Sequence, residues 1–394
     1  MPPVYYRIGI KNYRVLGCEA KDGPQFLVRP HQNLRPKACL HCGSPRLRSK
    51  GRYWRRVRHL EVCGRQSTLL IQAQRLRCGQ CQRSFVQPLP GIIKGRHSSE
   101  PLRELLYKQH HHGLCASSMA RLHRISAATI GRIYAQFTQR KAAERLSRQA
   151  PIVLGLDEHR APCPGGFATT LVDLKNHRVF DVVPGRSGTA LAAFLGSLRG
   201  RDKVRVVCID LSSPYRSLVR RFFPKAILVA DRFHVVRLAS HHFLELAKQL
   251  VPALRQRRSS HALLRKRPQR LTPAQAERLR LLLAEHPVLE PLHQRLHQLH
   301  RLLCFKHRTR RQCSRLLRVL LRFMALLEQS QFPAMLTLSS TFRSWLAEIA
   351  AMWRFTKSNG ITEGFHRKMK LIQRRAYGFR NFQNYRLRVI AQCG

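Results

Sequence analysis

The order of apolar segments after Pro151 constrains the fold more than any other feature of the sequence. Three strand-like segments come first, at 152–156, 167–173 and 178–183. They are followed by a helix at 189–198, a strand at 204–209, a helix at 213–222, a strand at 226–230 and a long helix from His234. Short apolar runs alternate here with segments of helical period. This series predicts a mixed sheet with helices on both of its faces.

The same order is typical of a ribonuclease-H-like domain, in which the first and fourth strands lie side by side. Asp157 ends the first strand-like segment and Asp210 ends the fourth. We therefore expect the two carboxylates to be neighbours. Two carboxylates held close together repel each other and bind a divalent cation readily.

Acidic residues are rare in this chain compared with basic ones, so acids that end apolar strands are unexpected. The 394 residues include 73 Lys and Arg but 20 Asp and Glu, a formal net charge of +53. So strong a potential suits a nucleic-acid backbone and exceeds what a small anionic substrate requires. The lack of an apolar stretch of ~18 residues and of a signal-peptide pattern predicts a soluble intracellular chain with no membrane partner. Twelve cysteines, with two CxxC pairs among them, indicate metal binding in a reducing compartment.

Glu363 is the candidate for a third metal ligand. It stands near the start of a helix expected at 362–370, where the helix dipole favours an acid. His366, Arg367 and Lys370 follow it at i+3, i+4 and i+7 and share its face. A metal-binding carboxylate beside phosphate-binding cations is what DNA cleavage requires. The structural alternative for each acid is a helix cap or a favourable contact with the helix dipole.

Asp231 is an alternative to Asp210. It also ends an apolar strand, and its DxxH spacing with His234 could supply metal ligands. We favour Asp210 because its strand is the one expected beside the first, and we assign Asp231 and His234 a supporting role. Glu158 points to the opposite face from Asp157 if the strand continues, so we give it a secondary role.

Two CxxC pairs, Cys39 with Cys42 and Cys78 with Cys81, predict a zinc ribbon. The two-residue gap lets both thiolates of a pair face one tetrahedral centre. Strand-like pieces lie between the pairs at 53–57 and 68–71, and Phe85 is placed to shield the metal. A closed four-thiolate site is structural. DNA contact is therefore expected from the cations around it, which are Arg46, Arg48, Lys50, Arg52, Arg55, Arg56 and Arg58.

Two helical regions complete the prediction. Residues 117–134 indicate two short helices around a turn, with Ser126 as the cap of the second. That helix would present Thr129, Arg132 and Gln136 to a DNA groove, although short helix pairs also occur in plain bundles. Residues 238–352 are expected to form a helical insertion with leucine stripes as its core. Its basic clusters at 255–258, 265–267 and 306–311 are candidates for DNA contact outside the cleavage site.

Several motifs together resemble one protein family. They are the double CxxC, Gly155-Leu156-Asp157-Glu158, Ala230-Asp231-Arg232-Phe233-His234, and Ser358-Asn359-Gly360-Ile361-Thr362-Glu363-Gly364 running into Arg374-Arg375-Ala376-Tyr377-Gly378-Phe379-Arg380-Asn381-Phe382. In this order, and over nearly the whole chain, the pattern resembles the transposases of the bacterial insertion-sequence family ISL three. His366 stands where many relatives carry Asn, and Gly188 and Thr189 depart from the family's loop. Neither departure affects the three acids.

The resemblance implies a set of site residues. Asp157, Asp210 and Glu363 would be the catalytic triad that binds magnesium or manganese, with Asp231, His234, Asn359 and His366 in support. The four cysteines would hold structural zinc. DNA would be bound by Arg46, Arg48, Arg52, Arg55, Arg56, Arg132, Arg367, Lys370, Arg374 and Arg375.

The expected fold is a multidomain α/β chain. Its parts are a zinc-ribbon domain at 1–96, a helix-turn-helix domain at 97–150, the first part of the ribonuclease-H-like core at 151–237, an all-α insertion at 238–352 and the rest of the core at 353–394. The implied enzyme is a DDE-type transposase of the bacterial cytoplasm, associated with the nucleoid and acting on DNA as a homo-oligomer. It would hydrolyse DNA at the terminal inverted repeats and join the freed 3′ ends to target DNA by two-metal phosphoryl transfer. The alternatives are a non-enzymatic DNA-binding regulator and a structure-selective nuclease on the same fold.

Overall fold

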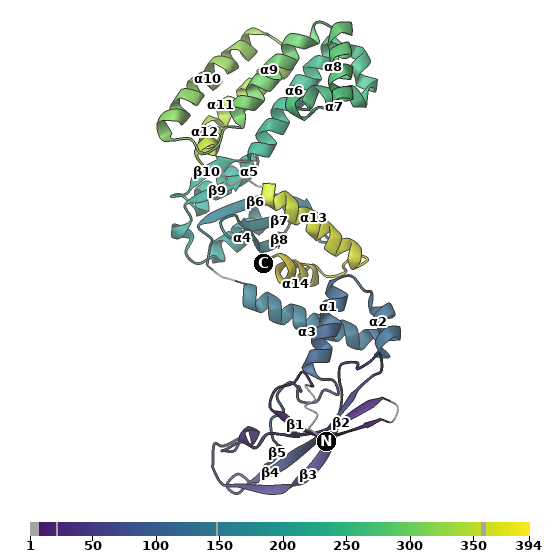
Figure 1. The fold of residues 1–394 in the computed structure, drawn as a ribbon. Coiled ribbons are helices and arrows are strands. Elements are labelled where there is room, and N and C mark those ends of the chain that lie inside the picture. Colours follow the sequence, from purple (N-terminus) through teal and green to yellow (C-terminus); the bar gives the residue numbers. More distant parts are fainter. Residues whose placement is uncertain (1–7, 21–22, 147–148, 356–359) are drawn as a thin grey trace. The chain divides into compact units, whose positions relative to one another are not determined.

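The computed structural model describes residues 8–20, 23–146, 149–355 and 360–394. The chain divides into two compact units, Met1–Arg140 and Lys141–Gly394, whose elements are labelled in Figure 1. Asn359, predicted to support the catalytic acids, lies outside the described residues. None of the helices in the described ranges is long and apolar enough to cross a membrane.

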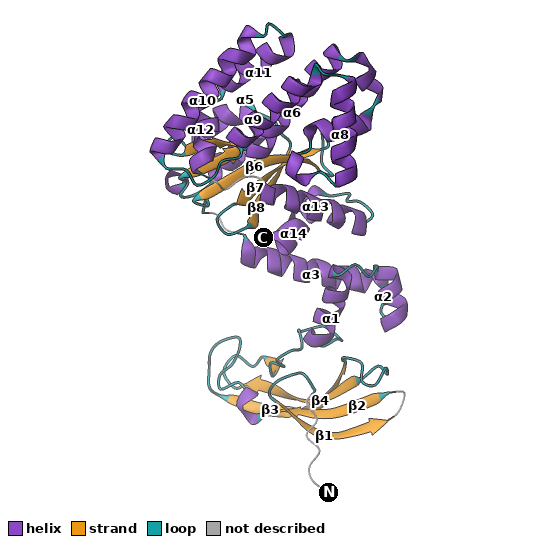
Figure 2. Ribbon diagram, turned by 45° about the horizontal axis from the view of Figure 1, so that its top comes forward, coloured by secondary structure: helices purple, strands orange, loops and turns teal. Residues whose placement is uncertain are grey.

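The first unit contains a five-stranded sheet (Figure 2). Its order is β1 (Tyr13–Ala20), β2 (Pro24–Pro30), β4 (Thr68–Cys78) and β3 (Leu47–Arg58), and β5 (Ser84–Val86) pairs with β4. The strand pieces expected at 53–57 and 68–71 are parts of the long antiparallel pair β3–β4. Val28, Val57 and Ile71 are fully buried in the core of this sheet. Because β4 ends at Cys78, it delivers the second CxxC pair to the sheet edge where β3 begins.

Three helices follow in the first unit. They are α1 (Glu100–His111), α2 (Ala116–His123) and α3 (Ala127–Arg145), the last of which continues into the second unit. Leu106, Met119 and Ile130 are buried together in their core. Between α2 and α3 the chain turns at Arg124, which has a left-handed φ of 47°. The Ser126 hydroxyl accepts a hydrogen bond from the Thr129 amide at 3.3 Å, so the predicted cap of the second helix is present.

The second unit is built on another five-stranded sheet, in the order β8 (Arg178–Pro184), β7 (Phe167–Asp173), β6 (Val153–Arg160), β9 (Val206–Ile209) and β10 (Ile227–Ala230). Strand β7 is antiparallel to both of its neighbours, β6 and β8, whereas β9 and β10 run parallel to β6. Counted from β6, the spatial order is three, two, one, four, five. The prediction that the first and fourth strands are neighbours is confirmed, and with it the mixed α/β fold.

Helices cover both faces of this sheet. One face packs against α4 (Gly188–Ser197) and α5 (Ser213–Phe222) through a core that includes Leu156 and Leu171. The other face packs against α13 (Gly360–Arg375) and α14 (Phe382–Cys393) through Val179, Val182 and Tyr385. Strand β6 extends past the expected end at 156 to Arg160, because β7 pairs with it along its length. Asp157 therefore lies inside a strand rather than at its end.

The insertion is entirely helical, as predicted. It comprises α6 (Arg232–Leu250), α7 (Arg258–Arg265), α8 (Pro273–Glu285), α9 (Leu289–Leu303), α10 (Arg310–Gln329), α11 (Pro333–Ser344) and α12 (Leu346–Arg354). Helix α6 begins directly after β10, so it belongs to the core at one end and to the insertion at the other. Arg216 of α5 and the buried Glu348 of α12 tie the two parts together with hydrogen bonds of 2.8 and 2.6 Å.

Candidate active site and zinc centre

Three aspartates end up level with one another on neighbouring parallel strands. The sheet register pairs Gly155 with Cys208, and Ile209 with Ala230. Continuing the register along each strand places Asp157, Asp210 and Asp231 in one row, with neighbouring strands about 4.8 Å apart. The row forms because each acid directly follows or extends an apolar strand, and parallel strands end at the same edge of a sheet. The structure therefore brings together both candidates for the second ligand.

The row is electrostatically strained. Burial raises the pKa of Asp157 from 3.8 to about 7, and the charges of Asp210 and Asp231 add to this rise while His234 opposes it. Burial also raises the pKa of Asp210, and the charges of Glu158 and Asp231 act in the same direction. The carboxylate oxygen Oδ1 of Asp210 is buried and has no hydrogen-bond partner among the described residues. A carboxylate oxygen that is buried and has no hydrogen-bond partner is a favourable ligand for a metal ion.

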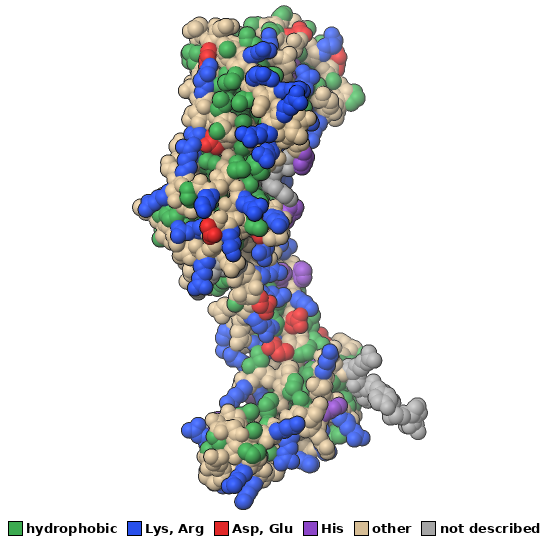
Figure 3. Space-filling view, turned by 90° about the vertical axis from the view of Figure 1, so that its left-hand side faces the viewer, with side chains coloured by type: hydrophobic (Ala, Val, Ile, Leu, Met, Phe, Trp, Pro, Cys, Tyr) green, Lys and Arg blue, Asp and Glu red, His purple; other side chains and the backbone are tan. Residues whose placement is uncertain are grey.

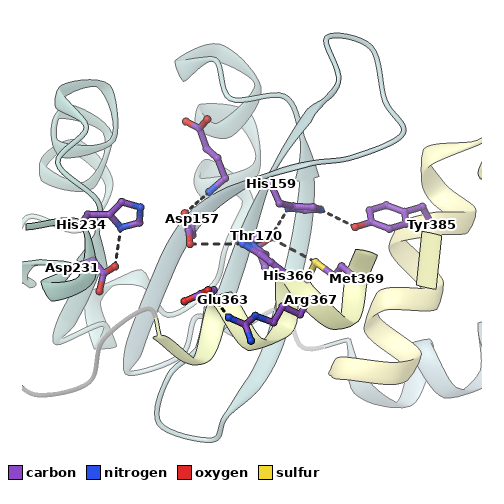
Figure 4. Close-up of polar contacts among 11 residues, drawn as sticks. Asp157, His159, Thr170, Asp231, His234, Glu363, His366, Arg367, Met369 and Tyr385 are labelled. Carbon is purple, nitrogen blue, oxygen red and sulfur yellow. Dashed lines mark hydrogen bonds and ion pairs between the residues drawn. The ribbon is translucent and has the colours of Figure 1, made fainter. Parts of the chain in front are cut away.

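His234 is the basic group nearest to this row. Its Nδ1 lies 2.8 Å from Oδ2 of Asp231, whose side chain is 1 % exposed (Figure 4). That hydrogen bond raises the pKa of His234, and the charges of Asp231, Asp157 and Asp210 raise it further. Asp231 is thus engaged by an imidazole, whereas Oδ1 of Asp210 is left open. This difference favours Asp210 as the metal ligand and Asp231 as the residue that orients His234.

Glu363 lies on the first turns of α13 and is not gathered into the row. Its side chain is 50 % exposed and pairs with Arg367 at 3.0 Å, one helical turn further on (Figure 4). The four cysteines are the group of potential metal ligands in the described ranges whose ligand atoms all lie within 4.8 Å of one another. Asp157, Asp210 and Glu363 are not that close. The connection between Glu363 and the row runs through the next turn of α13.

That connection is a chain of polar contacts which the sequence did not reveal. His366 of α13 lies with Nδ1 3.8 Å from Oδ2 of Asp157 and with Nε2 3.0 Å from the Thr170 hydroxyl. The same hydroxyl contacts Nδ1 of His159 at 2.8 Å, and Nε2 of His159 contacts the Tyr385 hydroxyl at 2.8 Å. Burial lowers the pKa of His366 to about 4, so its contact with Asp157 is a dipolar contact of a neutral ring. The chain of contacts fixes α13, and therefore Glu363, against β6.

One signal in the sequence points to part of this chain. His159 is two residues after Asp157, so strand alternation places both on the same face of β6. Nothing local identifies Thr170 or Tyr385, since each comes from a different element. Glu158 points to the opposite face of β6, as expected. Its charge nevertheless raises the pKa of Asp210, and its carboxylate lies 3.9 Å from Arg186.

The four cysteines meet as predicted. Sγ of Cys39 is 3.7 Å from Sγ of Cys81, and Sγ of Cys42 is 3.6 Å from Sγ of Cys78. Four thiolates about 2.3 Å from one zinc ion stand roughly 3.8 Å apart in a tetrahedron, so these separations fit zinc. Backbone amides of Cys81 and Gln80 lower the pKa of Cys78 to about 6, which favours the thiolate that a metal requires.

The two CxxC turns differ in the residue that takes a left-handed conformation. In the first CxxC turn Gly43 takes a left-handed φ of 73°, as a glycine after the turn permits. In the second turn the left-handed residue is Gln82, with φ 56°, and not Gly79. A Cβ at Gly79 would lie 3.5 Å from Arg46, which is ordinary van der Waals contact, so the space around this position does not require a glycine. Phe85 is buried in one cluster with Cys39 and Cys78, as expected of a residue that shields the metal.

The predicted DNA-binding cations do not all have the same surroundings. The side chains of Arg46, Arg48, Lys50, Arg52 and Arg56 are exposed. Arg55, in contrast, donates to the carbonyl oxygens of Ile93 and Arg96 at 3.2 and 2.8 Å, and Arg58 donates to the carbonyls of His123 and Arg124. These two arginines hold loops in place. On α3, Arg132 is exposed and contacts the Thr129 hydroxyl at 3.0 Å, while Gln136 accepts a hydrogen bond from Arg103.

Helix α13 presents the remaining cations. The side chains of Arg367, Lys370, Arg374 and Arg375 are all exposed. Tyr377 follows them in a left-handed conformation, φ 51°, and is 90 % exposed, which is unusual for an aromatic ring. A tyrosine displayed next to two arginines is a further candidate for nucleic-acid contact, and its flanking arginines were the signal in the sequence.

The fold and the two centres together define a class of protein. A ribonuclease-H-like sheet with acids on its central parallel strands, an all-α insertion before a helix-borne glutamate and a separate four-cysteine zinc unit are the arrangement of a transposase. Comparison with known families agrees. The model of the ISL3-type DDE transposases, described as "Transposase", matches residues 154–389, and that of the "zinc-finger of transposase IS204/IS1001/IS1096/IS1165" matches residues 35–81.

The chain therefore belongs to the ISL3 family of transposases, and the resemblance noted from its motifs is confirmed. Among individual proteins, it is similar to the "Transposase for insertion sequence element IS1001" of Bordetella parapertussis. The two are 26 % identical over 378 residues, which cover 91 % of this chain and 90 % of the relative. The zinc-finger match and the geometry of the four cysteines also support structural zinc.

Proposed function

We propose that this transposase binds the terminal inverted repeats of an insertion sequence, cleaves the DNA there and joins the 3′ ends to target DNA. The observation that carries the proposal is the row of largely buried carboxylates within β6 and directly after β9 and β10. A regulator without catalytic activity has no use for it, because buried like charges cost stability. A nuclease on the same fold would need the row too, and strand transfer is what separates the two activities.

The residues of the row fit a divalent metal. The open oxygen of Asp210 and the burial of Asp157 supply hard, negatively charged ligands of the kind that magnesium and manganese prefer. We assign Asp157, Asp210 and Glu363 as the ligands. When bound, such ions stabilise the charge that develops on a phosphate under attack and lower the pKa of the attacking water or hydroxyl.

The remaining groups have supporting tasks. His234, whose pKa is raised, supplies positive charge beside the row and is oriented by Asp231. The neutral His366 holds the oxygen of Asp157 on the side of α13. Arg367 and Lys370 lie on the same helix as Glu363 and are exposed, so they are placed to bind phosphates flanking the scissile bond.

DNA binding rests on charge. Figure 3 displays Lys and Arg side chains distributed over the visible face with few acids between them. In the first unit we assign binding of the repeats to Arg46, Arg48, Arg52 and Arg56 of the ribbon and to Arg132 of α3. On α13 we assign Arg374 and Arg375 to DNA near the cleavage site. Two ends must be joined in one reaction, so we propose that a homo-oligomer assembles on DNA.

The test is magnesium-dependent nicking of the element's terminal inverted repeats, taken from the DNA that flanks the coding region. Asp157→Asn should abolish nicking while repeat binding, measured by fluorescence anisotropy, stays intact. Asp202→Asn, at an exposed position of the same unit, is the matched control. An Asp157→Asn enzyme that still cuts would contradict the assignment. Wild type that nicks the ends but never joins them to target DNA would favour the nuclease.

A second pair of variants separates the two candidates for the second ligand. We expect Asp210→Asn to lose nicking altogether. Asp231→Asn should retain part of the rate, because it disturbs only the orientation of His234. The reverse ranking would make Asp231 the ligand.

A further inference from the structure

A groove starts at the catalytic row and runs into the insertion. Its volume is about 1060 Å³, and Asp210, Leu211 and His234 line its catalytic end. Helix α6 and the end of α7 supply most of the remaining lining, and Thr341 of α11 contributes to it. Since one end is formed by a proposed metal ligand, whatever occupies the groove is continuous with the reacting phosphate.

The lining of the groove selects an anionic occupant. Arg237 of α6 and Arg265 and Lys266 at the end of α7 contribute three cations, and His241 follows Arg237 one turn further along α6. Asp210 is the one carboxylate among the described residues of the lining. None of the three cations is ion-paired within the part of the chain that the structure describes. Lys266 donates to Oε1 of Gln275 at 2.6 Å and Arg265 to the carbonyl of His261 at 3.2 Å, so both hold neutral acceptors. Cations that line a groove without an acidic partner are suited to a phosphate backbone.

Phe233 makes the groove more than a basic channel. It begins the stripe Phe233, Arg237, His241, Leu244 on α6, and its side chain is 50 % exposed. Its ring meets that of His234 edge-on, with the centroids 5.4 Å apart. Because half of Phe233 stays exposed to solvent, the packing of the folded chain gives this ring little hydrophobic stabilisation. An aromatic ring beside a basic track is how proteins hold unpaired bases, which stack on it whatever their sequence.

The length of the groove sets the length of its occupant. From Phe233 to Leu244 the helix rises about 16 Å at 1.5 Å per residue. This corresponds to roughly four or five nucleotides at the 3.4 Å spacing of a stacked strand, and fewer in an extended one.

We propose that this groove binds a short unpaired stretch of DNA strand next to the scissile phosphate. Phe233 stacks on the first unpaired base, and Arg237, Arg265 and Lys266 bind the phosphates that follow. The ends of the element are therefore opened at the cleavage site rather than held as a continuous duplex. This inference rests on the proposed function and adds the conformation of the DNA to it.

The binding test uses full-length protein and two fluorescent probes with the sequence of one terminal repeat. One probe is fully paired, and the other carries about four mismatched nucleotides at the cleavage position. Wild type should prefer the mismatched probe. Phe233→Ala should weaken binding of that probe about tenfold and leave the paired probe unchanged. Phe233→Trp should restore the preference, and Phe332→Ala, at another exposed phenylalanine, should keep it.

The cations are tested by salt dependence. The variant with Arg265→Ala and Lys266→Ala should bind the mismatched probe with a logarithmic salt slope smaller by about one to two. Arg280→Ala is the control, because that exposed arginine is paired with Glu277. Unfolding midpoints of all variants should equal that of wild type, since the altered side chains are at least partly exposed. Equal weakening of both probes by Phe233→Ala, or none, would overturn the stacking role.

Nicking distinguishes this inference from the proposed function. A wild type that nicks the repeats in magnesium but does not prefer the mismatched probe refutes the groove assignment alone. A wild type that prefers the mismatched probe but never nicks refutes the catalytic assignment alone. An additional readout is 2-aminopurine placed at the cleavage position, whose fluorescence should rise on binding of Phe233→Ala and stay quenched by stacking in wild type.

Discussion

Removing a proposed catalytic charge should make the protein more stable. In the native state Asp157 is largely buried beside Asp210 and Asp231, and its side chain is 14 % exposed. Its pKa is raised from 3.8 to about 7. At about 1.4 kcal/mol per pH unit, a rise of that size corresponds to at most about 4 kcal/mol of destabilisation when the carboxylate is ionised.

The expected gain for Asp157→Asn is about 2 kcal/mol, roughly half of that limit. The reduction arises because Asp210 and Asp231 share the titration, so part of the rise in pKa belongs to the row as a whole and not to Asp157 alone. The asparagine oxygen keeps the hydrogen bond that the Glu158 amide donates at 2.8 Å. A gain in stability with a loss of activity is the pattern expected of a catalytic site.

The pH dependence has a definite sign. Below about pH 4 Asp157 is protonated in both the folded and the unfolded state, so the substitution changes little. Between 3.8 and about 7 the folded state retains a proton that the unfolded state has released, and wild type loses stability as the pH rises. The advantage of the variant should therefore grow across this window and stay constant above it.

The assay is urea unfolding in buffer without magnesium or manganese, at pH 5 and pH 8. In a Trp54→Phe background, fluorescence reports on the buried Trp345 and Trp353 of the second unit alone. Added magnesium should stabilise wild type and not the variant, because an ion that binds only the folded state shifts the equilibrium towards it. A variant less stable than wild type at pH 8, or a gain that is equal at both pH values, would refute the electrostatic reasoning.

Asp173→Asn is the matched control. Asp173 is another buried aspartate of the same sheet, but its carboxylate accepts hydrogen bonds from the amides of Lys175 and Asn176 and from the Asn176 side chain. Its replacement should lower stability by about 1–3 kcal/mol, since these donors lose a charged acceptor. The same chemical change should thus have opposite signs at the two positions.

Three further outcomes follow from the structure. Glu348→Gln should lower the stability of the second unit by about 3 kcal/mol in the urea assay, because it leaves the Arg216 charge without its buried partner, whereas Glu277→Gln on the surface should have no measurable effect. Cys42→Ser should lose the bound zinc in elemental analysis, and limited proteolysis should then cut the first unit while sparing the second. Burial lowers the pKa of His300 from 6.5 to about 4, so the unfolded state binds a proton first as the pH falls through this window. The free energy of unfolding of wild type should therefore fall by up to about 1.4 kcal/mol per pH unit between these values, and His300→Gln should reduce that slope.

Local patterns predicted the elements of the sheet in the second unit well. Each strand and helix between 152 and 230 was expected within a few residues of its bounds, because its period and its flanking turns are properties of short segments. The clearest misjudgement was the end of β6. A polar run at Asp157-Glu158-His159 looks like the end of a strand, and only the pairing with β7 keeps it extended.

The sequence by itself determined the identity of the chemical groups and the family. Spacing decides that Cys39 and Cys42 can share a metal, and chain order decides that Asp157 and Asp210 lie on adjacent strands. Tertiary structure decided which partners these groups meet. Contacts between distant segments decide that Oδ1 of Asp210 has no hydrogen-bond partner among the described residues and that Asp231 is hydrogen-bonded to His234. They also form the chain of polar contacts from Asp157 to Tyr385. The exposure of Phe233 in a basic groove likewise depends on tertiary structure. The burial of a side chain and its pKa depend on all of its neighbours in space, and most of these come from distant parts of the chain.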